Sequence, residues 1–378
     1  MLPIQKISKK IDKSLHEIIN STIETYKIET SAPQFYSSIK EFTFRDGKRI
    51  RPLLFVLSYM GFSDRIPKNL FTCVASIELF HTFILIHDDI IDRSSLRRGS
   101  ATLHQKFNSI LRNFENPKFK GEDLSIVVGD LIYSMAIHSF LSIKEKRLKK
   151  EQSLRKILET AFHTGNGQLI ELINTTKKIS EISLSQIYHT YDLKTAAYTF
   201  AGPLAAGAIL GGASGSTVEK LFDSGMKLGR AFQIKDDLLD LFGDTDSMGK
   251  NCLNDISEAK KTLPIWHAYQ NGTPSEREFF DNIYTTGNIK KADVSRIRRV
   301  LKTRGSVEYS SKIMQQLISI ADIETCTKGM KKDCRKSLMQ VINKLLNVKE
   351  LVDICDKTFQ DYQAGAIKNP HFHPSPGL

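Results

Sequence analysis

Two stretches that share one pattern decide the fold of this chain: Asp88-Asp89-Ile90-Ile91-Asp92 and Asp236-Asp237-Leu238-Leu239-Asp240. On a helix, residues i and i+4 lie on one face, so each stretch presents its first and last carboxylates to one point. Strongly apolar residues precede both stretches, at 82–86 and 231–234. Carboxylates in such surroundings repel one another and resist desolvation unless a cation holds them. The pattern therefore predicts cation sites, and Mg²⁺ suits carboxylate oxygens.

The alternative interpretation is that each acidic stretch is an ordinary charged helix end. Two copies with matching apolar flanks argue against it, since a single short motif often arises by chance. The polar, glycine-containing run at 93–100 also predicts that the first acidic helix ends near Asp92. The helix macrodipole disfavours acidic side chains at that end. Helix stability alone would not place them there, which favours a functional role.

The length and composition favour one large domain. The chain has 378 residues, and no linker rich in Pro, Gly or Ser divides the first 300. We expect a helical domain over 1–350, followed by the end of a helix and a loose tail over 351–378. No uninterrupted apolar run reaches the ~18 residues of a membrane span, and no signal peptide opens the chain. These features predict a cytoplasmic protein with no transmembrane segment. The five cysteines form no CxxC pair and are expected to be reduced.

The net charge is +12, from 54 basic and 42 acidic residues. A basic chain can bind nucleic acid, an acidic membrane surface or small anions. The clusters at 144–151 and 290–299 are typical of solvated helix ends. No zinc-finger spacing, RNP-like aromatic motif or long basic tail is present, so nucleic acid is not an expected partner.

Apolar periodicity predicts helices along nearly the whole chain. Isoleucine and leucine recur at three- and four-residue steps from Ile4 to Ile23, which is typical of an amphipathic helix. Further helices are predicted at 124–144, 151–177, 183–211, 217–241 and 261–270. There is no convincing period-two strand. The sequence predicts an all-α, single-domain helical bundle whose two acidic stretches project into a central cavity.

Basic residues accompany the acidic stretches. Lys48 and Arg51 stand at i and i+3, and Arg97 and Arg98 closely follow Asp92. Lys194, Lys250 and Lys260 extend the set. Carboxylates that bind a metal, together with Lys and Arg that take up remaining charge, suit a diphosphate ligand.

In its acidic stretches and accompanying basic residues, the chain resembles the polyprenyl diphosphate synthase family of trans-prenyltransferases. The resemblance is carried by Gly47 to Pro52, Glu78 to His81, His87 to Asp92, Arg97 to Gly99, Gly129 to Leu131, Gly167-Gln168, Lys194-Thr195, Phe232 to Asp240, Gly249-Lys250 and Lys260 to Pro264. It implies a helical bundle, usually a homodimer, with about three Mg²⁺ bridging the acidic clusters and an allylic diphosphate.

Roles follow from the resemblance position by position. The principal Mg²⁺ ligands would be Asp88, Asp92 and Asp236, supported by Asp89, Asp237 and Asp240. The site for isopentenyl diphosphate would use Lys48, Arg51, His81 and Arg98, although without the resemblance His81 is better interpreted as a core histidine on an apolar helix. The allylic substrate would face Arg97, Lys194, Thr195, Gln233, Lys250 and Lys260.

The resemblance also implies a reaction. The allylic diphosphate ionises with help from Mg²⁺, the isopentenyl double bond attacks the cation, and loss of a proton leaves a longer allylic diphosphate. Product length should depend on the residues below the first cluster. Helical geometry places Ile84 and Phe80 one and two turns below Asp88, whereas the family pattern singles out Phe83. The pattern resembles archaeal-type geranylgeranyl diphosphate synthases, while bulky Phe80 keeps farnesyl diphosphate open as the product.

Two other readings share parts of this pattern. A terpene cyclase would carry a different second metal motif in place of 236–240. A noncatalytic partner subunit of a prenyltransferase would have lost metal or phosphate residues, and here none is missing. The chain departs from the family in its basic charge, in the polar insertion at 113–121 and in the region after about residue 271.

Overall fold

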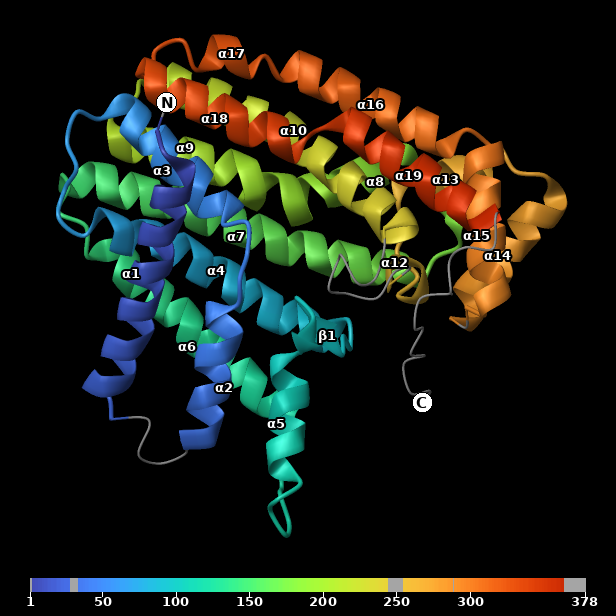
Figure 1. Cartoon of the computed structure of the whole chain (residues 1–378), viewed down its shortest axis with the longest axis horizontal. Helices are drawn as coiled ribbons and strands as arrows, with labels where there is room; N and C mark the ends of the chain where they lie inside the picture. The colour runs from blue at the N-terminus through green and yellow to red at the C-terminus, as the bar shows by residue number, and fades with distance from the viewer. Residues whose placement is uncertain (1, 28–32, 244–253, 288, 364–378) are drawn as a thin grey trace. The chain divides into compact units, whose positions relative to one another are not determined.

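The computed structural model describes all residues except 1, 28–32, 244–253, 288 and 364–378 (Figure 1). The described part of the chain is helical, apart from an antiparallel pair of two-residue strands, β1 (Leu96–Arg97) and β2 (Ser100–Ala101). The all-α prediction is thereby confirmed, although the expectation of no strands missed this short hairpin. The single domain over 1–350 stays a prediction, because the described residues form two compact units.

Unit 1 consists of residues 1–158, 203–219 and 328–338. Its helices are α1 (Ile4–Thr25), α2 (Pro33–Phe44), α3 (Ile50–Phe62), α4 (Leu70–Ile91), α5 (Leu103–Leu111), α6 (Gly121–Leu141) and most of α9 (Gly202–Gly211). Four helices contribute residues to both units: α9, whose first residue Gly202 belongs to unit 2, together with α7 (Arg147–Thr175), α10 (Gly215–Phe242) and α18 (Lys332–Leu345).

The centre of unit 1 is α4, which packs against α6, α1 and α3 (Figure 1). The α1 face predicted from periodicity is the buried one, since Ile11, Leu15 and Ile19 are almost fully inaccessible. From α3, Phe55 meets Phe140 of α6 edge to face, with ring centroids 6.0 Å apart. Burial of each such side chain contributes about 1.5–3 kcal/mol. The first acidic stretch is thus carried by a firmly packed core helix.

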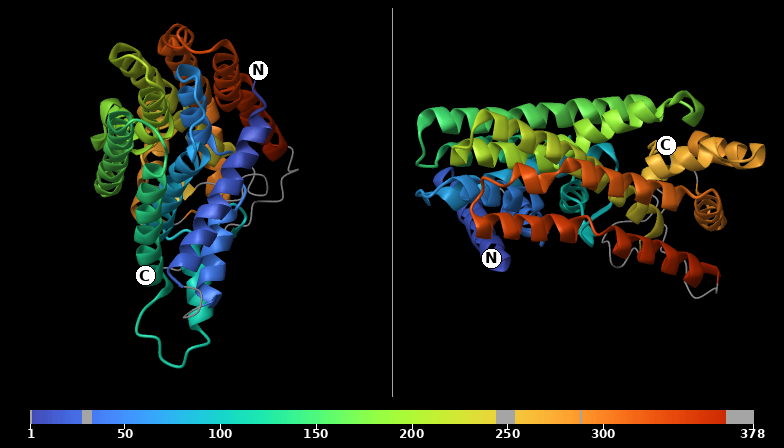
Figure 2. Two further views of the ribbon diagram at one scale, coloured as in Figure 1. Left: turned by 90° about the vertical axis from the view of Figure 1, so that its left-hand side faces the viewer. Right: turned by 90° about the horizontal axis from the view of Figure 1, so that it is seen from above.

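Unit 2 consists of residues 159–202, 220–327 and 339–378. Besides its parts of the shared helices, it contains η2 (Ile179–Glu181), α8 (Leu184–Tyr191), the π-helix η3 (Asp192–Ala201), α12 (Asn254–Ser257), α13 (Leu263–Gln270), α14 (Pro274–Thr286), α15 (Lys291–Thr303), α16 (Ser306–Ala321), α17 (Ile323–Cys326) and α19 (Val348–Gln363). Helix α16 contacts α13, α15 and α19, and the right-hand view of Figure 2 shows α16 (orange) beside α19 (red).

The helix boundaries largely follow the sequence prediction, with one correction. The acidic helices end where expected, α4 at Ile91 with Asp92 as its C-cap and α10 at Phe242. The helix predicted over 183–211 is confirmed as an unbroken helical run from 184 to 211, but its middle, 192–201, is the π-helix η3 rather than an α-helix. The tail at 369–378 lies outside the described residues.

Two described helices have the length and composition of a membrane span. These are α4 and α6, whose most apolar windows each have a mean hydropathy of 1.6. Neither window is an uninterrupted apolar run, because the α4 window includes Glu78 and the α6 window includes Asp130. Inside the protein, 61% of the α4 window and 39% of the α6 window are buried, and core helices also pass this test. Length and composition therefore do not identify either helix as a span.

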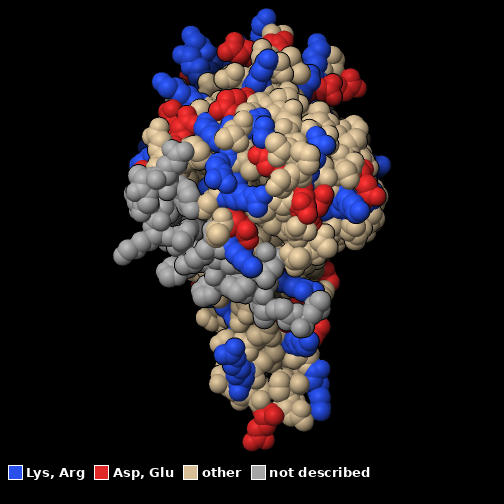
Figure 3. All heavy atoms as spheres, turned by 90° about the vertical axis from the view of Figure 1, so that its right-hand side faces the viewer, with Lys and Arg blue, Asp and Glu red and all other residues tan. Residues whose placement is uncertain are grey.

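Surface charges of both signs are mixed on the face that Figure 3 displays. At the start of α7, the exposed side chains of Arg147 and Glu151 form a 2.6 Å ion pair, as expected of a solvated helix end. Arg298 of α15 does not fit that expectation. It is 2% exposed, and its Nε donates to the Leu241 carbonyl oxygen at 2.8 Å. This basic residue therefore caps the C-terminal end of α10 rather than facing solvent.

Candidate active site

The first acidic cluster occupies the C-terminal turn of α4 in unit 1. The side chains of Asp88 and Asp92 are half-buried, whereas Asp89 is 1% exposed. The Asp92 amide donates to the Asp88 carbonyl oxygen at 2.8 Å and closes the last turn. The two carboxylates that the i, i+4 spacing places together thus belong to a well-formed helix end.

Arg97 of β1 binds the buried member of this cluster. Its Nε and Nη2 donate to Asp89 Oδ1 at 2.8 and 2.5 Å, and Nη2 lies 3.9 Å from Asp88 Oδ2. Burial raises the pKa of Asp89 to about 6, with Arg97 opposing this shift. Asp89 Oδ2 is buried and accepts no hydrogen bond from any residue in the described ranges. An orphaned carboxylate oxygen of this kind fits a cation ligand.

The second acidic cluster lies on α10 in unit 2, and its members differ in accessibility. Asp236 is half-buried, whereas Asp237 and Asp240 are each 1% exposed. Asp237 accepts hydrogen bonds from Gln233 Nε2, at 2.8 Å, and from the Tyr191 hydroxyl. Desolvation raises the pKa of Asp237 well above its usual range, and nearby Asp255 acts in the same direction. Asp236 is therefore the member best placed to reach a ligand.

The carboxylates of each cluster could supply some, but not all, of the ligands of a divalent cation. Among the residues that the structure describes, no group of three or more His, Cys, Asp or Glu side chains could hold a metal ion by itself. The hard oxygen donors of Asp88, Asp92 and Asp236 suit Mg²⁺ or Ca²⁺, and such ions commonly complete their shell with water and phosphate oxygens. Each cluster thus supplies part of a coordination sphere.

A group of cations surrounds His81 on α4. Burial lowers the pKa of His81 well below its usual value, and the charges of Arg51, Arg98, Arg97 and Arg49 lower it further. The ring is therefore neutral at physiological pH. Lys48, the other basic residue predicted here, is exposed at the surface. The residues predicted from sequence, Arg51, His81, Arg97 and Arg98, thus lie close together. Arg49, to which the sequence prediction gave no role, belongs to the same group.

The π-helix η3 carries Lys194 and Thr195. Lys194 forms an ion pair with Glu171 of α7, and Thr195 Oγ1 donates to Gln233 Oε1 at 2.5 Å. Through Gln233, the threonine connects to Asp237 in one continuous network. π-Helical segments are frequent at functional sites. Three residues predicted from separate parts of the sequence, Thr195, Gln233 and Asp237, are therefore brought together.

Of the two remaining predicted lysines, Lys250 and Lys260, the structure describes only Lys260. Lys260 forms ion pairs with Glu258 and, at 3.7 Å, with Asp255 of α12, so acidic residues close to it in the sequence hold it. Lys250 lies outside the described residues.

Aromatic residues on α4 and α6 form a cluster one to two turns below Asp88. The Tyr133 ring centroid lies 5.6 Å from that of Phe80 and 4.9 Å from that of Phe83. Phe80 is buried, whereas Phe83 and Ile84 are half-buried. Sequence reasoning weighed Phe80 against Phe83 and did not consider Tyr133, which touches both rings from a second helix.

Other residues of the two clusters were also missed. Tyr191 and Glu171 stand in no distinctive motif, and Glu78 lies in the stretch 78–81 that carries the resemblance but was given no role. These three residues meet their partners across 46, 23 and 29 residues of chain. Only the fold brings such pairs together.

Comparison with known proteins agrees with this geometry. Residues 32–303 match the family model described as polyprenyl synthetase. A short chain isoprenyl diphosphate synthase of Methanocaldococcus jannaschii is 32% identical over 301 residues, covering 79% of this chain and 84% of that protein. An octaprenyl diphosphate synthase of Escherichia coli is 31% identical over 265 residues, covering 70% and 75%.

A solved structure is also similar. It is a geranylgeranyl pyrophosphate synthase from Corynebacterium glutamicum, complexed with isoprenyl diphosphate and magnesium. The TM-score is 0.83 at 25% identity, covering 91% of this chain and 99% of that one.

Proposed function

Because the chain belongs to the polyprenyl synthetase family, we propose that it joins isopentenyl diphosphate to allylic diphosphates and makes mainly geranylgeranyl diphosphate. The observation that carries this proposal is the composition of unit 1. The end of α4 presents Asp88 and Asp92 beside Arg97, and further arginines surround neutral His81. Oxygen donors for a metal next to guanidinium groups for phosphate oxygens suit a diphosphate.

We infer that Asp88, Asp92 and Asp236 hold the divalent cations, supported by Asp89, Asp237 and Asp240, with about three Mg²⁺ when substrate is bound. Bound magnesium would neutralise charge that develops on the leaving diphosphate. Magnesium in the similar C. glutamicum structure supports this choice of ion. Within the chain, Arg97 keeps a positive charge against Asp89 and Asp88 and so limits the repulsion between these carboxylates.

Two sets of residues, most of them basic, would then bind the two substrates. We propose that Lys48, Arg51, His81 and Arg98 bind isopentenyl diphosphate, and that the allylic substrate uses Arg97, Lys194, Thr195, Gln233, Lys250 and Lys260. Neutral His81 can donate a hydrogen bond to a phosphate oxygen without adding charge to a crowded cationic group. In the proposed reaction the allylic C–O bond breaks, a C–C bond forms, and the released diphosphate accepts the proton.

Product length is the least constrained part of the proposal, since the relatives include both geranylgeranyl and octaprenyl synthases. We propose that Phe80 and Phe83 limit the growing chain together, because Tyr133 contacts both rings. Ile84, on the same helix, is half-buried and carries no ring. The alternative product, farnesyl diphosphate, corresponds to Phe80 alone acting as the stop.

We also propose that the enzyme is a cytoplasmic homodimer. Helix α6 exposes Ile126, Val127 and Leu131, and α7 exposes Phe162 and Leu169, which are 76% and 57% exposed. Large exposed apolar side chains of this kind are typical of protein interfaces.

The proposal is tested by incubating the purified protein with Mg²⁺, isopentenyl diphosphate and labelled dimethylallyl, geranyl or farnesyl diphosphate. Chromatography of the dephosphorylated products should show geranylgeraniol. Farnesol or a longer alcohol would correct the product. No product would favour a noncatalytic partner subunit, and a cyclic hydrocarbon would favour a terpene cyclase.

A further inference from the structure

Arg49 has an unusual backbone and a fully engaged side chain. It precedes α3 with φ +47°, in the left-handed region that non-glycine residues seldom occupy. Its side chain is 4% exposed. Nε donates to Asp12 Oδ1 at 2.8 Å, Nη1 to Glu78 Oε1 at 2.7 Å, and Nη2 to the Arg45 carbonyl oxygen at 3.0 Å. Arg49 is therefore an internal clamp for the chain between Lys48 and Arg51, rather than a substrate ligand.

The clamp extends to Arg98. Glu78 Oε1, which accepts from Arg49, also lies 3.7 Å from Arg98 Nη2, and Arg98 Nη1 donates to the Arg45 carbonyl oxygen at 3.0 Å. The guanidinium lies directly on Gly47, where a Cβ atom would come within 2.9 Å of Nη2. A series of alternating charges thus runs through the proposed isopentenyl diphosphate site, in the order Asp12, Arg49, Glu78 and Arg98.

Asp12 is the outermost member and comes from a different part of the chain. It stands on α1, whereas the family match begins at residue 32. Its side chain is 43% exposed, yet its partner is buried. Without the Asp12 charge, Glu78 would be the one carboxylate bonded to Arg49. It would then be drawn toward Arg49 and away from Arg98, and the left-handed backbone beside Lys48 and Arg51 would lose a restraint.

We propose that Asp12 is a positioning residue for isopentenyl diphosphate, acting through Arg49 on Lys48, Arg51 and Arg98. The inference rests on the proposed function. According to this proposal, α1 supports the isopentenyl diphosphate site through Asp12 but does not contact the substrate.

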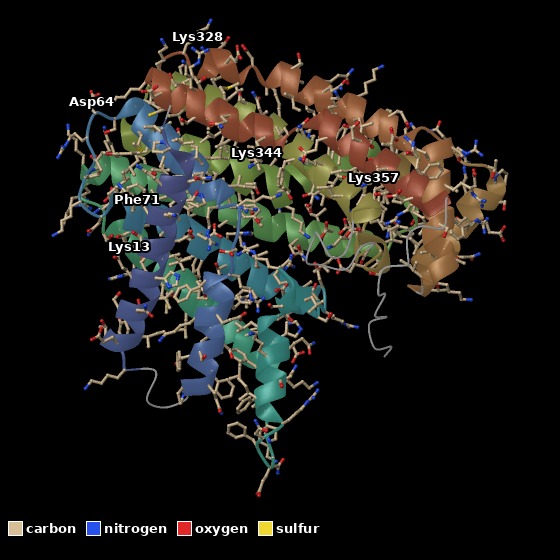
Figure 4. The ribbon with its side chains drawn as sticks, viewed as in Figure 1. Lys13, Asp64, Phe71, Lys328, Lys344 and Lys357 are labelled. Carbon is tan, nitrogen blue, oxygen red and sulfur yellow. The ribbon has the colours of Figure 1, made fainter. Side chains whose placement is uncertain are left out.

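The test is steady-state kinetics of Asp12→Asn with each substrate varied in turn. The KM for isopentenyl diphosphate should rise about tenfold, because Asn keeps an acceptor for Arg49 Nε but loses the negative charge that strengthens this contact. The KM for the allylic substrate should change less than about twofold. Asp12→Glu, which keeps the charge, should recover most of the affinity. The matched control is Glu17→Gln, because Glu17 is on the same helix but pairs at 3.7 Å with exposed Lys13, labelled in Figure 4.

Isothermal titration of wild type with isopentenyl diphosphate, followed by product assay, separates this inference from the proposed function. If wild type neither binds nor converts isopentenyl diphosphate, the proposed function is wrong. If wild type does both and Asp12→Asn has unchanged affinity, the positioning role is wrong. Equal rises in both KM values would also overturn it, since they indicate a general loss of structure.

Discussion

The Tyr191 hydroxyl donates a hydrogen bond to Asp237 Oδ2 and accepts one from the Leu263 backbone amide at 2.7 Å. One phenol thus connects α8, the second acidic cluster on α10 and the start of α13. Gln233 occupies the other carboxylate oxygen of Asp237. Asp237 is therefore fixed from both sides, which orients α10 so that Asp236 is its more accessible carboxylate.

Replacing this phenol should destabilise the protein. Tyr191→Phe leaves the Leu263 amide and Asp237 Oδ2 buried without their partner, which costs about 1–3 kcal/mol in the free energy of unfolding. Urea denaturation measures the change. Tyr188→Phe, which keeps the ring beneath the Arg230 guanidinium at 4.7 Å, is the control and should change stability by less than about 0.5 kcal/mol. Equal stability of Tyr191→Phe and wild type would contradict the network.

A second prediction concerns Ala259, just before Lys260. Lys260 N donates to Asp255 O at 2.8 Å and Ala259 N to Ile256 O at 2.9 Å, the pattern of a Schellman cap after α12. Ala259 has φ +56°, a conformation that costs an L-residue about 1–2 kcal/mol.

Ala259→Gly should therefore stabilise the protein by about 0.5–1 kcal/mol, after allowing for the larger unfolded-state entropy of glycine. The same change at exposed Ala292, in the first turn of α15, should instead destabilise the protein, by no more than about 1 kcal/mol. Thermal unfolding of both variants checks this, and a destabilised Ala259→Gly protein would refute the strained cap.

A third prediction concerns pH and Lys261. Its Nζ donates to the Thr175 and Ala259 carbonyl oxygens, each at 2.8 Å, and burial lowers its pKa to about 8. Between about pH 8 and 10.5 the unfolded state binds more protons than the folded state, so this residue's contribution to stability rises with pH.

Relative to Lys261→Met, wild type should therefore gain free energy of unfolding between pH 8 and 10. Denaturation at several pH values measures the difference, with the same substitution at exposed Lys328 (labelled in Figure 4) as control. A pH-independent difference between wild type and Lys261→Met would argue against the lowered pKa.

Product length provides a fourth prediction. Phe80→Ala, Phe83→Ala and Tyr133→Ala should each lengthen the product, because each removes a ring from one contacting cluster and each added CH₂ gains ~0.8 kcal/mol on burial. Ile84→Phe should shorten it toward farnesyl diphosphate. Chromatography of the products measures both shifts, with exposed Phe119→Ala as control. Unchanged lengths in all four variants would place the stop on another helix.

The parts of the fold that depend on local pattern were predictable from sequence. The apolar repeat of α1 predicts its buried face, and the polar run after Asp92 predicts the end of α4. The π-helix η3 was not predictable, because its geometry depends on packing. A Cβ atom at Gly229 of α10 would lie 2.4 Å from Ala196 Cα, so the two backbones approach closely there. A single sequence gives no sign of that approach.

The candidate site likewise contains residues that the sequence predicts and residues that only the fold brings together. The carboxylates and cations stand in short motifs, so their residue types and spacing indicate their chemistry directly. The partners of these residues do not stand in such motifs. Glu171 pairs with Lys194, and Glu78 with Arg49, only because separate helices meet. Sequence reasoning therefore predicts the groups that would touch substrate, and this prediction stays untested, whereas the groups that hold those side chains in place were missed.

The central claim is that two acidic clusters act together through divalent cations. The most direct measurement is the rate of incorporation of labelled isopentenyl diphosphate by wild type, Asp88→Asn and Asp236→Asn, each with EDTA and with restored Mg²⁺. We predict that EDTA abolishes turnover, that Mg²⁺ restores it in wild type, and that each variant loses at least about a hundredfold while retaining its helical circular dichroism. Near-wild-type turnover in either variant, or full activity in EDTA, would contradict the claim.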